Sequence, residues 1–166
     1  MAKYSSGIKS ISMGAIAADG GMGTTLTSVG DIFLGSAIFE EAEDAITDFY
    51  SELQDDPILS VGVNGLKTLT FTLVDVTPAQ AILFLGGTAT GTTPTLRYGA
   101  PLTFVTIEQS LQILTKEGYT IQIPRAKINA RLLWSFSKTD MAKIEVKARV
   151  LMPTKAGVEP YAWTLA

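Results

Sequence analysis

"KINARLLWSFSKTDMAKIEVKARVL", residues 127–151, is the stretch that decides the fold. Apolar and polar residues alternate in it twice, over 127–137 and again over 143–151. The apolar positions are Ile128, Ala130, Leu132, Trp134, Phe136, Ile144, Val146, Ala148 and Val150. Alternation with a period of two is typical of a strand with one buried face, and Ser137–Asp140 ("SKTD") predicts a compact turn. We therefore predict two paired strands, with both aromatic residues of the first run in the core.

The same pattern continues towards the N-terminus. "SLQILTKEGYTIQIP", residues 110–124, predicts a hairpin that turns at Glu117-Gly118. Leu66–Val76 alternates again, and Gly7–Ala17 fits a first strand. The chain is therefore expected to be mainly β.

One helix is expected, in "TPAQAILFLGG" at residues 77–87. Thr77 suits the N-cap, Pro78 suits the first helical position, and Gly86-Gly87 ends the helix. Because a helix this short and apolar must bury its surface, we expect it to pack against the sheet. The predicted class is a β-sandwich or β-barrel with one packed α-helix and long extended loops or arms.

Two segments rich in glycine and threonine have no periodicity, namely 19–30 and 86–101. They are predicted to be long loops or hairpin arms. A chain of 166 residues is expected to form a single domain. In this interpretation residues 1–166 are one domain, and the N-terminal segment 1–30 and the loop 86–101 are its assembly arms.

The acidic stretch "FEEAEDAITDFYSELQDDP", residues 39–57, contains eight carboxylates and no base. Its apolar residues have a spacing that fits an amphipathic helix, and Glu and Ala are good helix formers. However, Thr47–Ser51 would also pair as a strand. Residue propensities alone slightly favour the helix, and Pro57 ends either element.

The composition excludes several classes of function. The chain has neither histidine nor cysteine, so catalytic triads that contain them, thiolate metal sites and disulfides are ruled out. A net charge of −3 argues against a basic surface that binds nucleic acid. The longest uncharged run, Val76–Leu96, contains prolines and glycines and is not expected to span a membrane. A mean hydropathy of +0.27 with 17% charged residues favours oligomerisation.

No local motif predicts catalysis. The acidic stretch lacks the glycine of a calcium loop, and nothing in it identifies one buried and one ionised carboxylate. The glycine loops lack the lysine of a phosphate-binding loop. Trp134 and Trp163, with Phe136 and Tyr161, could form a sugar-stacking platform, although core packing suits Trp134 better. Trp163 could equally anchor a partner or lie in the core. We therefore expect no catalytic, cofactor-binding or metal-ligating residue, and no enzyme activity.

The charges are strongly separated along the chain. Residues 40–56 sum to −8, whereas residues 116–155 sum to +6. Two such patches can pair the front of one copy with the back of another, or can be merely solvated or neutralised within one subunit. The candidate assembly residues are Glu40, Glu41, Glu43, Asp44, Asp48, Glu52, Asp55, Asp56, Arg125, Lys127, Arg131, Lys143, Lys147, Arg149 and Trp163.

The order of these parts resembles the tail tube proteins of long-tailed bacteriophages. The resemblance covers nearly the whole chain, from a strand with a "DGG" loop through "E..ITDFYSE....P" to a terminal "P....V.PY". Its most specific part is "DVTPAQAILFLGG" at 75–87 followed by "IPRAKINA" at 123–130.

The resemblance implies a structural protein of the virion tail that is assembled in the host bacterial cytoplasm. Six copies would form a ring with a continuous inner barrel, and rings would stack head to tail through a long loop and terminal arms. DNA would pass through the bore, and the partners would be a tail terminator, a tape-measure protein and baseplate or distal tail proteins. The resemblance also implies that the acidic stretch is extended, and we adopt that expectation.

Two other functions remain open. The inner tube of a contractile injection or type VI secretion system would have the same fold and symmetry with effectors as cargo. A carbohydrate-binding β-sandwich would use Trp163 and Tyr161.

Overall fold

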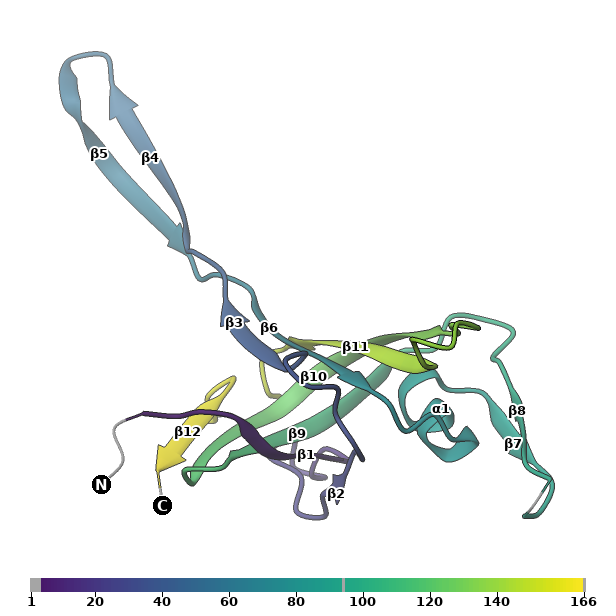
Figure 1. Cartoon of the computed structure of the whole chain (residues 1–166). Helices are drawn as coiled ribbons and strands as arrows, with labels where there is room; N and C mark the ends of the chain where they lie inside the picture. The colour runs from purple at the N-terminus through teal and green to yellow at the C-terminus, as the bar shows by residue number, and fades with distance from the viewer. Residues whose placement is uncertain (1–3, 94, 166) are drawn as a thin grey trace.

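The computed structural model describes residues 4–93 and 95–165 and is mainly β with antiparallel sheets (Figure 1). Its strands are β1 (Ile8–Gly14), β2 (Thr27–Ser28), β3 (Ile38–Glu41), β4 (Ala45–Ser51), β5 (Gln54–Val63), β6 (Lys67–Leu73), β7 (Thr88–Thr90), β8 (Arg97–Gly99), β9 (Ile107–Thr115), β10 (Tyr119–Leu133), β11 (Lys143–Val150) and β12 (Ala162–Leu165). The helix found in the described part of the chain is α1 (Pro78–Leu85).

The main sheet has the order β2-β1-β9-β10-β11-β6-β3, and β12 also pairs with β10. Strand β10 pairs with β9 over Thr120–Ile128, with β12 over Tyr119–Gln122, and with β11 over Ala126–Leu133. The register shifts between Ile123 and Ala126, where Pro124 has no N–H to donate to the ladder. Instead, the carbonyl of Pro124 accepts a 2.6 Å hydrogen bond from the hydroxyl of Ser110.

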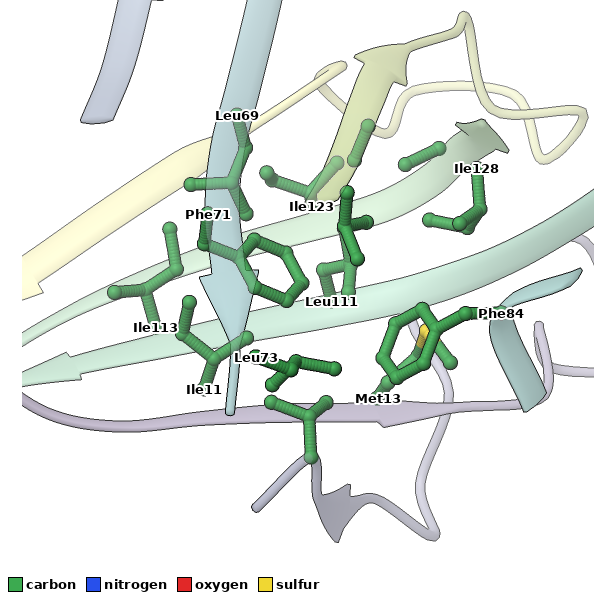
Figure 2. Packing of buried hydrophobic residues seen from close by; sticks show 14 of the residues in the cluster. Ile11, Met13, Leu69, Phe71, Leu73, Phe84, Leu111, Ile113, Ile123 and Ile128 are labelled. Atoms are coloured by element: carbon green, nitrogen blue, oxygen red, sulfur yellow. The ribbon is translucent and has the colours of Figure 1, made fainter. Parts of the chain in front are cut away.

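The core lies where β6 crosses over β1, β9 and β10 (Figure 2). Leu69, Phe71 and Leu73 of β6 are buried, as are the inward residues of the strands below them. Phe84 of α1 joins this cluster, with its ring edge-on to Phe71 at a centroid distance of 6.1 Å. The sheet thus bends over one apolar cluster, which α1 covers at one end.

The helix has the ends predicted from the sequence. The side chain of Thr77 accepts a 3.3 Å hydrogen bond from the backbone N–H of Gln80, and Pro78 occupies the first turn. At the other end Gly86 has a φ of +74° and donates its N–H to the carbonyl of Ile82.

The strand predictions from the alternating pattern are confirmed for β1, β6, β9, β10 and β11. The hairpin between β9 and β10 turns at the predicted position, where Gly118 has a φ of +94°. On β11 the predicted core residues Ile144, Val146, Ala148 and Val150 are all buried.

The prediction that Trp134 and Phe136 are core residues is wrong. The β10–β11 ladder ends at Leu133↔Lys143, so residues 134–142 form a longer connection than the predicted turn. Trp134 is 59% exposed and Phe136 is 95% exposed. Alternation of residue types continues beyond Leu133, but in the described part of the chain no strand pairs with residues 134–136.

The prediction of a helix in the acidic stretch, which residue propensity favoured, is also wrong. Residues 38–41 form β3 and residues 45–51 form β4, so this segment is extended as the resemblance implies. Strand β3 is held by its ladder with β6, and β4 is held by its ladder with β5. Long-range pairing therefore outweighs the local propensity of Glu and Ala.

The two segments expected to be arms differ in their surroundings. Residues 86–101 contain the small hairpin of β7 and β8, which pair from Thr88↔Gly99 to Thr90↔Arg97. In contrast, segment 19–30 lies against the body, because Gly20, Gly21 and Gly23 are buried. The assembly role of segments 1–30 and 86–101 stays a prediction.

Candidate assembly surfaces

The most prominent surface feature is the hairpin of β4 and β5, which projects away from the rest of the chain (Figure 1). Every residue of the two strands except Ser51 is exposed. A β-hairpin is marginally stable in water on its own, and three or more strands or a packed partner are needed for independent stability. The β4–β5 hairpin therefore lacks a surface to pack against within its own chain.

The two faces of this hairpin differ in character. Residues directly opposite each other across a ladder share a face, and one face is formed by Ala45↔Val63, Thr47↔Val61 and Phe49↔Leu59. The other face carries Ile46↔Gly62, Asp48↔Ser60 and, beyond a register shift, Tyr50↔Pro57, so it mixes polar and apolar residues. Phe49, Leu59 and Val61 are each about half exposed, at 49%, 56% and 45%. The first set, called here the apolar face of the hairpin, is a strip of hydrophobic side chains open to solvent.

The base of the hairpin is closely held. Ala42 donates its backbone N–H to the carbonyl of Leu66 at 2.9 Å, and Gly65 donates to a carboxylate oxygen of Asp44 at 2.7 Å. A Cβ on Gly65 would lie only 1.7 Å from the carbonyl oxygen of Ala42, so only glycine fits there. These contacts fix the direction in which the hairpin leaves the sheet.

The hairpin carries four of the eight acidic candidate residues. Asp48, Glu52, Asp55 and Asp56 are exposed, and none of them makes an ion pair with another residue in the described part of the chain. Glu43 and Asp44 lie just before β4. The hairpin is therefore both apolar on one face and strongly negative.

The basic candidates collect on the side of the sheet that faces away from the core. The register places Lys127 opposite Arg149, Asn129 opposite Lys147, and Arg131 opposite Glu145. These positions alternate with the buried residues of β10 and β11, so they share the outer face. A hollow of about 660 Å³ on this face is lined by Arg131, Glu145 and Lys147, among others.

Several candidate charges already have partners within the subunit. Arg125 pairs with Glu108 at 2.8 Å, Lys143 with Asp140 at 3.1 Å, and Arg131 with Glu145. In contrast, Lys127, Lys147 and Arg149 make no ion pair among the described residues, although Lys127 lies 5.6 Å from the ring centre of Phe104.

Glu41 is likewise paired within the subunit, whereas its neighbour Glu40 makes no ion pair among the described residues. The ammonium of Lys67 lies 2.6 Å from the carboxylate of Glu41, and the hydroxyl of Tyr161 donates to the same carboxylate at 3.1 Å. The hydrogen bond from Lys67, helped by that from Tyr161, holds the pKa of Glu41 below its ordinary value. Glu41 thus fastens the C-terminal segment to β3 and β6.

Trp163 lies on β12 and is 62% exposed. Its ring is tilted against that of Tyr119 at a centroid distance of 6.1 Å. The ring of Tyr161 packs instead against Phe39, at 5.2 Å. The two aromatic residues considered for sugar stacking therefore have different ring neighbours.

A set of exposed hydrophobic residues that the sequence pattern does not predict is called here the aromatic end. Its members are Phe33, Leu34, Leu102, Phe104, Trp134, Phe136 and Met141. They lie in segments that adjoin the end of β6, the end of β10 and the starts of β9 and β11. The signal was present in the hydrophobic residues of 134–141, but their alternation predicted a core strand.

Few polar side chains are buried in the described part of the chain. Its buried polar residues are Thr68 and Ser110, so none of its carboxylates is buried. The described residues contain no group of three or more Asp and Glu side chains placed to hold a metal ion. No helix in residues 4–93 and 95–165 has the length and hydropathy to cross a membrane.

Comparison with known proteins gives no further assignment. No protein-family model matches the chain, and no curated protein is significantly similar to it in sequence.

Proposed function

We propose that the protein is a structural subunit of a bacteriophage tail tube, forming hexameric rings that stack head to tail around a bore for DNA. The β4–β5 hairpin is the observation that carries this proposal. It is held firmly at its base, exposed on both faces, apolar on one face and acidic overall. Such an element gains stability when another copy of the chain covers it.

The edges of the sheet add support. Strands β2 and β3 are the edge strands of the main sheet, and β12 pairs along one side only. Unpaired strand edges can pair with another chain, and closure into a ring removes them. The bent sheet over a single core with one helix also suits the β-sandwich or barrel that a ring subunit requires.

The overall charge suits passage of DNA. With a net charge of −3 the protein has no excess of bases to hold phosphates, and a bore built from it would repel the duplex. The tail terminator, tape-measure and baseplate or distal tail proteins would be partners at the two ends and inside the tube. The virion tail is then the place where the protein acts, after assembly in the bacterial cytoplasm.

An inner tube of a contractile injection or type VI secretion system is the closest alternative and shares the same assembly. The two differ in cargo, so neighbouring capsid genes would support the phage tail and a secretion sheath gene would support the alternative.

The exposure of Trp163 favours, as a second function, a carbohydrate-binding module. Glycan binding that is lost on Trp163→Ala, without any polymer, would support that function.

Sedimentation velocity tests the assembly proposal. We expect the sedimentation coefficient to rise with protein concentration, and to fall when salt is added at constant concentration. The reason is that the Debye length shortens from about 10 Å at 0.1 M to about 3 Å at 1 M, which weakens pairing between acidic and basic surfaces. A single monomeric species at every concentration and salt would contradict the proposal.

A further inference from the structure

We propose that Asn64 is a site of spontaneous modification, at which the side-chain amide is lost and the main chain is lengthened, and that the carboxylate of Asp44 slows this reaction. The site lies in the neck of the hairpin, defined here as residues 42–44 and 64–66. The neck joins the ladder of β3 and β6 to that of β4 and β5 (Figure 1). The reaction needs only water and no partner, so it does not depend on the proposed function.

The dipeptide Asn64-Gly65 brings together the two groups that the reaction needs. The nucleophile is the backbone nitrogen of the residue that follows asparagine, and a glycine there has no side chain to cover it. Asn64 is exposed and lies between β5 and β6, outside both ladders, so its side chain can turn back towards that nitrogen. The other asparagine of the chain, Asn129, is followed by alanine and lies within the ladder of β10 and β11. Of the two asparagines, Asn64 is therefore the thermolabile one.

The packing of the neck keeps glycine at position 65. A Cβ there would lie 1.7 Å from the carbonyl oxygen of Ala42 and 3.0 Å from that of Glu43. A larger residue could therefore shield the nitrogen only by opening the neck. The reactive dipeptide is thus a consequence of how closely the two sides of the neck approach each other.

Asp44 holds the nucleophile in an unreactive arrangement. The backbone N–H of Gly65 donates to a carboxylate oxygen of Asp44 at 2.7 Å. The reaction requires this nitrogen to lose its proton and to face the side chain of Asn64. A hydrogen bond to an ionised acceptor fixes the direction of the N–H, and the negative charge beside the nitrogen opposes removal of its proton. Asp44 therefore slows the reaction in the folded chain.

The modification consists of two balanced steps. The nitrogen of Gly65 forms a bond to Cγ of Asn64, the bond from Cγ to Nδ2 breaks, and the proton of that nitrogen leaves with Nδ2 as ammonia. Water then adds to one of the two carbonyl carbons of the cyclic imide, the bond from that carbon to nitrogen breaks, and a proton of the water passes to the nitrogen. Opening at Cγ gives aspartate. Opening at the backbone carbonyl carbon gives isoaspartate, in which the main chain runs through Cβ and Cγ.

Isoaspartate alters the neck more than aspartate does, because it adds an atom to the main chain on one side only. On that side Gly65 packs against Ala42, and the carbonyl of Leu66 accepts a 2.9 Å hydrogen bond from the N–H of Ala42. The strands on either side of the neck are fixed by their own ladders. The added atom therefore breaks the contacts of the neck, and the hairpin loses its fixed direction.

Mass spectrometry of protein kept at neutral pH and physiological temperature tests the site and its protection. We expect the mass change from amide to acid at Asn64 well before any at Asn129. The variant Asp44→Ala should react about tenfold faster, the rate factor that corresponds to the loss of one hydrogen bond to a charged group. Glu43→Ala is the matched control, because Glu43 is the adjacent exposed carboxylate and makes no ion pair among the described residues. Its rate should equal that of the unmodified protein.

Equal reaction at the two asparagines would overturn Asn64 as the site. A rate in Asp44→Ala no higher than that of the unmodified protein, or an equal acceleration by Glu43→Ala, would overturn the protective role of Asp44.

Amide hydrogen exchange separates the lengthened main chain from the added charge. The isoaspartate form, isolated by chromatography, should exchange the N–H of Ala42 faster than freshly purified Asn64→Asp, which carries the same charge on an unchanged main chain. Equal exchange in the two would overturn the loss of direction of the hairpin.

Discussion

Replacing residues 45–63 with an Asn-Gly turn is expected to abolish assembly while the body stays folded. The deleted strands contain no residue of the buried core cluster, and their ladder is formed only between themselves. The Asn-Gly pair supports a two-residue hairpin turn between Asp44 and Asn64. We therefore expect the free energy of unfolding of the body to change by no more than about 1 kcal/mol, because the removed residues are exposed.

Sedimentation and circular dichroism of the deletion variant check both parts of this expectation. A matched pair of point variants separates the two faces of the hairpin. Phe49→Thr removes an apolar side chain from the apolar face, and Ile46→Thr makes a similar change on the other face. Phe49→Thr should weaken assembly more. A deletion variant that still forms the same polymers would show that the hairpin is not the joint.

The change Phe71→Ala should have the largest effect on stability. Phe71 is 1% exposed, lies where β6 crosses the strands below it, and meets Phe84 of the helix. Removing a buried phenylalanine typically costs about 3–5 kcal/mol, because the cavity adds to the lost transfer energy. That is a large share of the roughly 5–15 kcal/mol that stabilises a typical domain.

Urea unfolding with Phe136→Ala as the matched control measures this effect. Phe136 is the same residue type at 95% exposure, and its loss should change the free energy of unfolding by no more than about 0.5 kcal/mol. Equal effects of the two substitutions would contradict the placement of the core and of the aromatic end.

The local signals of the sequence predicted most of the body. The predictions from alternation in β6 and β11 were confirmed because one face of each strand is buried against the core, whereas the other is at most partly buried. The helix prediction was confirmed because Thr77, Pro78 and Gly86 set the helix ends through contacts with the backbone close to them in sequence. The prediction that Trp134 is buried was wrong because alternation cannot reveal where a partner strand ends. Here the ladder stops at Leu133.

The candidate surfaces were predicted only in part. The excess of acids in 40–56 and of bases in 116–155 can be counted from the sequence. Which of these charges are neutralised inside the subunit depends on strand register, as Glu41 with Lys67 and Arg125 with Glu108 show. The apolar face of the hairpin likewise becomes visible only when Phe49 is seen opposite Leu59.

Negative-stain electron microscopy of the purified protein, at high concentration and low salt, tests the central claim most directly. We predict rings with a central hole that stack into tubes, and single particles only from the variant that lacks residues 45–63. Compact monomers from the unmodified protein under the same conditions would contradict the claim that copies of this chain join through the hairpin.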